Sequence, residues 1–158
     1  MRPRHAIYCV RPMTGFTLQA IKKYYARLSK RLHGMGYRVY HPLLCREEAD
    51  SARIVRPRGS TKLPHITDRA IFSRDRWMVR GADIVYANFL GATKASIGSC
   101  FEVAWAHILG KHVIVVMEEN NPHQHAFILE GADVVFDNER AALRYLSNWG
   151  ATSHAVNV

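Results

Sequence analysis

The chain has 158 residues, of which 48% are hydrophobic, enough for one globular domain spanning residues 1–158 and too little for a second. No apolar run approaches the roughly 20 residues of a membrane span, and the amino-terminal stretch lacks a signal-peptide layout, so we expect a cytoplasmic protein with no membrane partner. The net charge of +9 favours an anionic partner, a nucleotide or a nucleic acid, although it can also serve solubility alone.

The first half of the chain predicts two strands around one helix. An apolar stretch at 5–10 is the first strand, followed by the turn sequence RPMTGF. Apolar residues at spacings of three and four predict an amphipathic helix over 17–32, and a second strand follows at 37–42. Residues 43–63 are basic and lack periodicity, so we interpret them as a loop that serves as a lid over a site.

The second half alternates regularly between helix and strand. We predict helices over 67–80 and from 96 or 97 to 109, a short helical turn after 125 and a last helix over 139–146, with strands at 83–89, 112–117 and 133–136.

Continuously apolar strands that alternate with helices are typical of a parallel sheet covered on both faces. The sequence therefore predicts an α/β fold, a single-domain, flavodoxin-like (Rossmann-like), doubly wound sheet of five parallel strands. In such sheets ligands bind at the carboxyl ends of the strands, here near residues 8–15, 41–42, 87–91 and 117–121.

Glu102 lies early in its predicted helix, among Ile97, Phe101, Trp105 and other apolar residues. A glutamate near a helix amino terminus can simply favour the helix dipole. A carboxylate held among apolar groups beside a strand end is also a candidate nucleophile or acid–base group with a shifted pKa. We favour the second interpretation.

Other polar residues leave alternatives open. Asp75 sits between two arginines and is either a salt-bridged surface acid or a functional group. Asp83 belongs to a Gly-Ala-Asp step that recurs before the last strand, so we expect a structural turn. Asn88 either orients a ligand or satisfies a strand end. His123 and His125 have no third ligand in view and the three cysteines form no Cys-x-x-Cys pair, so we expect no metal, no cofactor and buried free thiols.

Three segments in order, IYCVRPMTG, RDRWMVRGADIVYANF and SIGSCFEVAWAHILGKHVIVV, resemble the nucleoside 2-deoxyribosyltransferase family, including its branch of deoxynucleoside 5'-monophosphate N-glycosidases. The resemblance implies a flavodoxin-like domain that assembles as homodimers or larger homo-oligomers with shared sites. The basic stretch at 43–63 has no counterpart that we can match.

The resemblance also implies catalytic roles. Glu102 matches the glutamate that attacks the anomeric carbon, Tyr8 a tyrosine that positions it, and Asp75 the aspartate that contacts the nucleobase or assists its departure. Ser96 stands where transferases tend to have an aspartate gripping the sugar 5'-hydroxyl and where the monophosphate hydrolases have serine. A serine hydroxyl at a helix start can donate to a phosphate that a carboxylate would repel.

Further substrate-binding residues follow from the same resemblance. Met13 and Gly15 belong to the first matching segment, Asn88 to the second and Gly98 to the third. Arg11 stands where family members often have glycine and offers a guanidinium to a phosphate. His125 lies near the place where the hydrolases receive a phosphate contact from the adjacent subunit.

The favoured function is hydrolysis of the N-glycosidic bond of a nucleoside 5'-monophosphate. The alternatives are base exchange between nucleosides and a non-catalytic nucleotide-binding sensor. Nucleic-acid binding is disfavoured although nine basic residues face five acids between Arg46 and Arg80, because only Phe72 and Trp77 could stack on bases there and no nucleic-acid motif is present.

Overall fold

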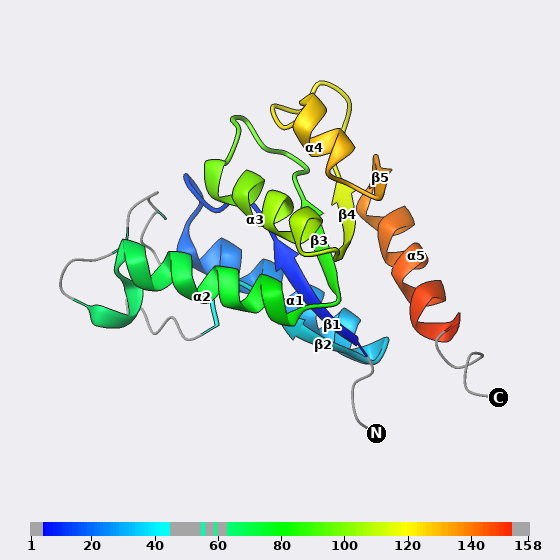
Figure 1. Cartoon of the computed structure of the whole chain (residues 1–158), viewed down its shortest axis with the longest axis horizontal. Coiled ribbons are helices and arrows are strands. Elements are labelled where there is room, and N and C mark those ends of the chain that lie inside the picture. Colours follow the sequence, from blue (N-terminus) through cyan, green and yellow to red (C-terminus); the bar gives the residue numbers. More distant parts are fainter. Residues whose placement is uncertain (1–4, 45–54, 56–58, 60–62, 153–158) are drawn as a thin grey trace.

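Five parallel strands form the centre of the molecule (Figure 1). The computed structural model describes residues 5–44, 55, 59 and 63–152. The strands are β1 (His5–Val10), β2 (Tyr37–Tyr40), β3 (Ile84–Asn88), β4 (His112–Val116) and β5 (Val134–Phe136). Their order in the sheet is β2-β1-β3-β4-β5, which is the flavodoxin-like order with its switch point between β1 and β3. The predicted fold class is confirmed.

Helices cover both faces of this sheet (Figure 1). The helices are α1 (Leu18–Gly34), α2 (Asp68–Gly81), α3 (Ile97–Ile108), α4 (Ala126–Glu130) and α5 (Glu139–Thr152), with a 3-10 helix, η1 (Pro64–Ile66), before α2. One apolar core lies between the sheet and α1 and α5, and the other between the sheet and α2, α3 and α4. Among the helices in the described part of the chain, none has the length and apolar character needed to cross a membrane.

Successive residues of β1 enter different cores. Ile7 and Cys9 face α1 and α5, whereas Tyr8 and Val10 face α2 and α3, because side chains alternate across a strand. Both faces are buried, which explains why the strands are continuously apolar in sequence. The alternation also directs Tyr8 toward the helix that carries Glu102.

The two Gly-Ala-Asp steps have the structural role that the sequence predicts. The Asp83 carboxylate accepts the Ala6 backbone N–H at 2.8 Å, and Asp133 accepts the Val113 N–H at 2.7 Å. Each aspartate also donates its own N–H to the carbonyl of the same partner residue. Each carboxylate therefore joins the start of one strand to the start of its neighbour.

The end of the last helix differs most from its predicted position. Helix α5 continues to Thr152 rather than ending at Leu146, because Trp149 stacks on His112 with ring centroids 4.3 Å apart. The predicted loop at 43–63 falls mostly on residues 45–54, 56–58 and 60–62, so its proposed role as a lid lies outside the described residues.

The sheet has a functional polarity. The carboxyl ends of the strands point toward the loops that precede α2 and α3, whereas the start of β1 and the end of α5 lie at the opposite edge (Figure 1). Cys9 is buried and Cys100 half-buried, and both are free thiols.

Candidate active site

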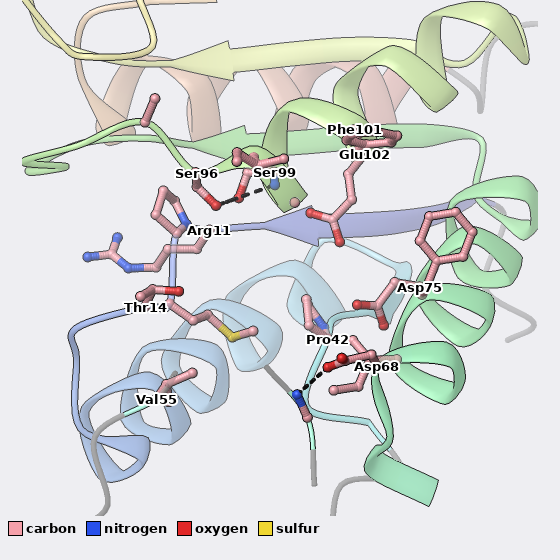
Figure 2. A pocket seen from close by; sticks show the side chains of 18 of the residues that line it. Arg11, Thr14, Pro42, Val55, Asp68, Asp75, Ser96, Ser99, Phe101 and Glu102 are labelled. Atoms are coloured by element: carbon pink, nitrogen blue, oxygen red, sulfur yellow. Dashed lines mark hydrogen bonds between the residues drawn. The ribbon is translucent and has the colours of Figure 1, made fainter. Parts of the chain in front are cut away.

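A cavity of about 630 Å³ opens where the loop after β1 meets α2 and the start of α3 (Figure 2). The switch in strand order separates the loops after β1 and β3 and leaves this crevice. Its lining includes Arg11, Pro12, Met13, Thr14, Pro42, Val55, Gly59, Asp68, Ile71, Phe72, Asp75, Lys94, Ala95, Ser96, Ile97, Gly98, Ser99, Phe101, Glu102 and Trp105.

Glu102 lies in the second turn of α3 and points into the middle of the cavity (Figure 2). It is 7% exposed, and its Oε1 accepts a 2.5 Å hydrogen bond from the Tyr8 hydroxyl. Burial, followed by repulsion from Asp75, raises the pKa of Glu102 to about 8, against the opposing effects of the Tyr8 hydrogen bond and of Arg74. The structure thus brings the predicted nucleophile and its predicted positioning tyrosine into direct contact.

The apolar residues around Glu102 in sequence differ in their placement: Ile97, Phe101 and Trp105 line its cavity, whereas Ile108 does not. The buried face of α3 consists of Ser99, Glu102, Val103 and Ala106. Ile97 is 76% exposed and Ile108 is 80% exposed. Because α3 carries apolar residues on both sides, periodicity alone cannot show which side meets the sheet.

Asp75, on α2, faces the same cavity from the other side (Figure 2). It is 8% exposed, so it is not the exposed surface acid of the alternative interpretation. The Arg74 guanidinium donates to Asp75 Oδ1 through Nε at 3.1 Å and through Nη2 at 2.9 Å, and Nη2 also donates to the Pro42 carbonyl at 3.0 Å. Arg74 therefore fixes both the orientation of Asp75 and its distance from the end of β2.

An aromatic wall adjoins this carboxylate. The rings of Phe72 and Trp105 meet edge to face with centroids 5.0 Å apart, and Phe101 meets Trp105 at 5.8 Å. These three side chains come from α2 and α3, which pack against each other. The wall provides an apolar surface on which a planar ring can lie.

The opposite end of the cavity is polar and basic. Ser96 caps α3, and its Oγ accepts the Ser99 hydroxyl at 3.0 Å and the Ser99 N–H at 3.4 Å. Arg11 and Lys94 line the same end, and the Arg11 guanidinium lies 4.3 Å from the ring centroid of Tyr24. The arrangement suits an anionic or hydroxyl-bearing group at this end.

The remaining predicted residues differ in their placement. Met13 and Gly98 line the cavity. Gly15 lies beside it with φ of +94°, and its N–H donates to the Val55 carbonyl at 3.0 Å. Asn88 points to the other face of the sheet, where its amide donates to the Tyr24 hydroxyl at 3.1 Å and to Glu139 at 3.2 Å. Asn88 thus satisfies a strand end and is not among the residues that line the cavity.

His125 lies outside the cavity of its own chain. It is exposed and caps α4 by accepting the Phe127 N–H at 3.2 Å. Within the described residues, no group of three histidine, cysteine or acidic side chains is placed to hold a metal ion.

Several residues of the site were missed at the sequence level. Ser99 follows Ser96 by one helical turn, and Phe72 precedes Asp75 by one turn, so helical spacing from the predicted residues would have identified both. Asp68 precedes Asp75 by two turns of α2, so the same spacing would also have identified it, whereas Lys94 lies in the loop before α3 and has no such signal.

A family model described as nucleoside 2-deoxyribosyltransferase matches residues 13–150 of the chain. The fold is similar to that of the 2-deoxyribosyltransferase from Bacillus psychrosaccharolyticus, with 18% identity, 89% of this chain and 91% of that chain covered and a TM-score of 0.64. It is also similar to a 2-desoxiribosyltransferase from Leishmania mexicana (17% identity, coverage 91% and 97%, TM-score 0.63). A CMP N-glycosidase from Clostridium botulinum is a third similar structure (17% identity, coverage 91% and 98%, TM-score 0.55). No curated protein matches the chain in sequence.

Proposed function

The chain belongs to the nucleoside 2-deoxyribosyltransferase family, and from that premise we propose that it hydrolyses the N-glycosidic bond of a nucleoside 5'-monophosphate through Glu102. The observation that carries the proposal is the buried Glu102 carboxyl, held by the Tyr8 hydroxyl at 2.5 Å inside a cavity that Asp75 also lines. If the role of this buried acid were purely structural, it would not need a cavity in front of it.

The two ends of the cavity suit the two ends of a nucleotide. The base lies against the Phe72 and Trp105 wall beside Asp75, and the 5'-phosphate lies at the end lined by Ser96 and Arg11. The anomeric carbon is then over Glu102, between the two ends. Ser96 supports a monophosphate over an unphosphorylated nucleoside, because a hydroxyl donates to a phosphate oxygen without repelling it.

The reaction proceeds in two displacements at the anomeric carbon. A Glu102 oxygen forms a bond to this carbon as the bond from carbon to the base nitrogen breaks, and the electron pair of that bond leaves with the base. The departing base takes up one proton, delivered through Asp75. Water then attacks the glycosyl-enzyme at the same carbon and gives one proton to the Asp75 carboxylate, which returns Glu102 as a carboxylate, restores the proton on Asp75 and releases the sugar phosphate.

The free site holds its nucleophile in the protonated form. With the pKa of Glu102 raised to about 8, the free protein at neutral pH carries a proton on this carboxyl group. Attack requires the ionised form, so this proton must leave Glu102 as substrate binds. The departing base receives its proton separately, from Asp75, which lines the same cavity.

Release of free base from a panel of nucleosides and their 5'-monophosphates tests the proposal. We expect release from at least one monophosphate, and a loss of at least about 1000-fold in Glu102→Ala and Glu102→Gln, since each removes the nucleophile. Glu130→Gln, a matched change at an exposed position on α4, should keep full activity. Absence of release from every substrate, with Glu102→Ala behaving like the wild type, would contradict the proposal.

Base exchange is the second candidate reaction, favoured by the family description and by the names of two similar structures. A transferase passes the glycosyl group from Glu102 to an added base instead of water. Adding an isotopically labelled acceptor base to the same assay separates the two, because only transfer places the label in a nucleoside or nucleotide.

We also propose that a second copy of the chain covers the apolar surface of α3 and α4. This surface consists of Ile97, Phe101, Ile108 and Phe127, of which Phe127 is 85% exposed. Exposed side chains of this size that cluster on adjacent helices mark an interaction site more often than a solvated surface. Ile97 and Phe101 also line the cavity, so a second copy seated on this surface would reach the site. The His125 of that copy, two residues before its Phe127, would then come close to the cavity as well.

A further inference from the structure

A buried imidazole lies behind the amino terminus of α3. His123 is 1% exposed and stacks on Phe89, with ring centroids 4.0 Å apart and an angle of 10° between the planes. Its Nε2 is 2.8 Å from the backbone nitrogen of Ser96. A backbone N–H can only donate, so Nε2 must accept, and the ring carries its single proton on Nδ1.

Asn121 completes this arrangement. Its Oδ1 is 2.9 Å from His123 Nδ1 and accepts the His123 backbone N–H, also at 2.9 Å. Its Nδ2 donates to the Phe89 carbonyl at 2.8 Å, which fixes the orientation of the amide. Every donor in this series faces an acceptor, so the end of β3, the loop after β4 and the start of α3 are joined through one neutral imidazole.

We propose that His123 is a positioning residue of the active site, whose neutral imidazole fixes the Ser96 backbone and thereby aims the Ser96 hydroxyl at the 5' end of the substrate. The inference rests on the proposed function for the identity of that group. With its N–H held by His123, Ser96 cannot turn about its own backbone. Its Oγ accepts from Ser99 twice, which leaves the Ser96 hydroxyl proton for a ligand in the cavity.

Substitution of His123 with leucine and with glutamine tests this role. Leucine keeps apolar bulk but offers no acceptor, whereas glutamine carries a carbonyl oxygen that can take the place of Nε2. We expect His123→Leu to raise KM for the monophosphate about tenfold, as for the loss of one well-oriented hydrogen bond of about 1.4 kcal/mol, and to change KM for the matching nucleoside much less. His123→Gln should return KM for the monophosphate most of the way to the wild-type value.

His112→Leu is the matched control, because His112 is also stacked on an aromatic ring but lies at the opposite edge of the sheet. It should lower the melting temperature and leave both KM values unchanged. The proposal would be overturned if His123→Leu raised KM equally for the monophosphate and the nucleoside, or if His123→Gln did not restore KM. His123 would then be a purely structural residue.

A measurement that does not depend on activity separates this inference from the proposed function. Nitrogen-15 NMR of the full chain at neutral pH should show His123 protonated at Nδ1 and unprotonated at Nε2, and the Ser96 amide resonance should shift in His123→Leu. A ring protonated at Nε2 would overturn the inference even in an active enzyme. If the wild type releases no base but this tautomer is found, the proposed function fails and the link from His123 to Ser96 stands.

Discussion

In the proposed reaction Glu102 must lose a proton before it can attack, and its surroundings oppose that loss. Burial and Asp75 raise its pKa to about 8, whereas the Tyr8 hydroxyl lowers it. We expect kcat/KM to rise with pH through about 8, because only the ionised carboxylate attacks. In Tyr8→Phe the carboxylate loses its donor, so this pKa should move upward and activity at pH 7 should fall, as pH–rate profiles of both forms can measure.

Tyr25→Phe is the control for this change. Tyr25 is also fully buried, and its hydroxyl has no hydrogen-bond partner in the described part of the chain. Loss of the Tyr25 hydroxyl should leave the pH–rate profile unchanged. An unchanged profile in Tyr8→Phe would mean that the group titrating in the rate is not Glu102.

The same raised pKa predicts how stability varies with pH. A carboxyl group with a pKa of 4.5 when unfolded and about 8 when folded binds more protons in the folded state between these values. Its presence therefore costs stability progressively as pH rises from about 4.5 to 8 and costs nothing extra below that window. At pH 8.5, Glu102→Gln should melt at a higher temperature than the wild type. Its free energy of unfolding should exceed that of the wild type by up to a few kcal/mol, at about 1.4 kcal/mol per pKa unit, and this difference should disappear at pH 4.5.

Glu102, Asp75 and Ser96 could be predicted from the sequence, because each lies in a short segment with a recognisable order of residues. The contacts that set their properties could not. The Arg74 hydrogen bond to Pro42 and the His123 hydrogen bond to Ser96 join residues 32 and 27 positions apart, and no local pattern encodes a pairing over that distance.

At the level of secondary structure, Asp83 and Asp133 offer a paired test. Each accepts the N–H of a residue at the start of a neighbouring strand, and both side chains are more than half exposed, at 57% and 54%. Replacing either with alanine leaves a strand N–H without its acceptor and should cost about 1 kcal/mol in chemical unfolding. Asparagine keeps an oxygen in place and should cost much less; similar losses from both replacements would contradict the hydrogen-bond explanation.

The predicted elements are correct in type and order because short, continuously apolar strands and helices of period 3.6 are clearly separated by glycine boundaries. The mistakes concern contacts between elements. The length of α5 depends on Trp149 meeting His112, and the orientation of α3 depends on which of its two apolar sides meets the sheet.

At the level of the whole molecule, the apolar surface of α3 and α4 predicts self-association. Ile108→Glu and Phe127→Glu each place a charge in the proposed contact between two copies, where it would be desolvated without a partner. We expect either variant to reduce the assembly to monomers in sedimentation velocity and to lower activity, since Ile97 and Phe101 join this surface to the cavity. Trp77→Glu, a comparable change at an exposed position on α2, should leave the assembly intact. A wild type that sediments as a monomer at micromolar concentration would contradict this expectation.

The sheet order followed from the sequence because parallel strands joined by helices permit few topologies. The apolar surface of α3 and α4 could not be predicted from the sequence, since an apolar residue on a helix has the same pattern whether it meets the sheet or a second copy of the chain.

The strands all run in one direction, and this has a practical consequence. The start of β1 at residue 5 and the end of α5 at residue 152 lie at the amino ends of the strands (Figure 1), whereas the cavity is lined by residues that follow the carboxyl ends of β1 and β2. An enzyme tethered to a solid support through either of these positions would present its open crevice to the surrounding solution, so substrates could enter and products leave as they do for the untethered protein.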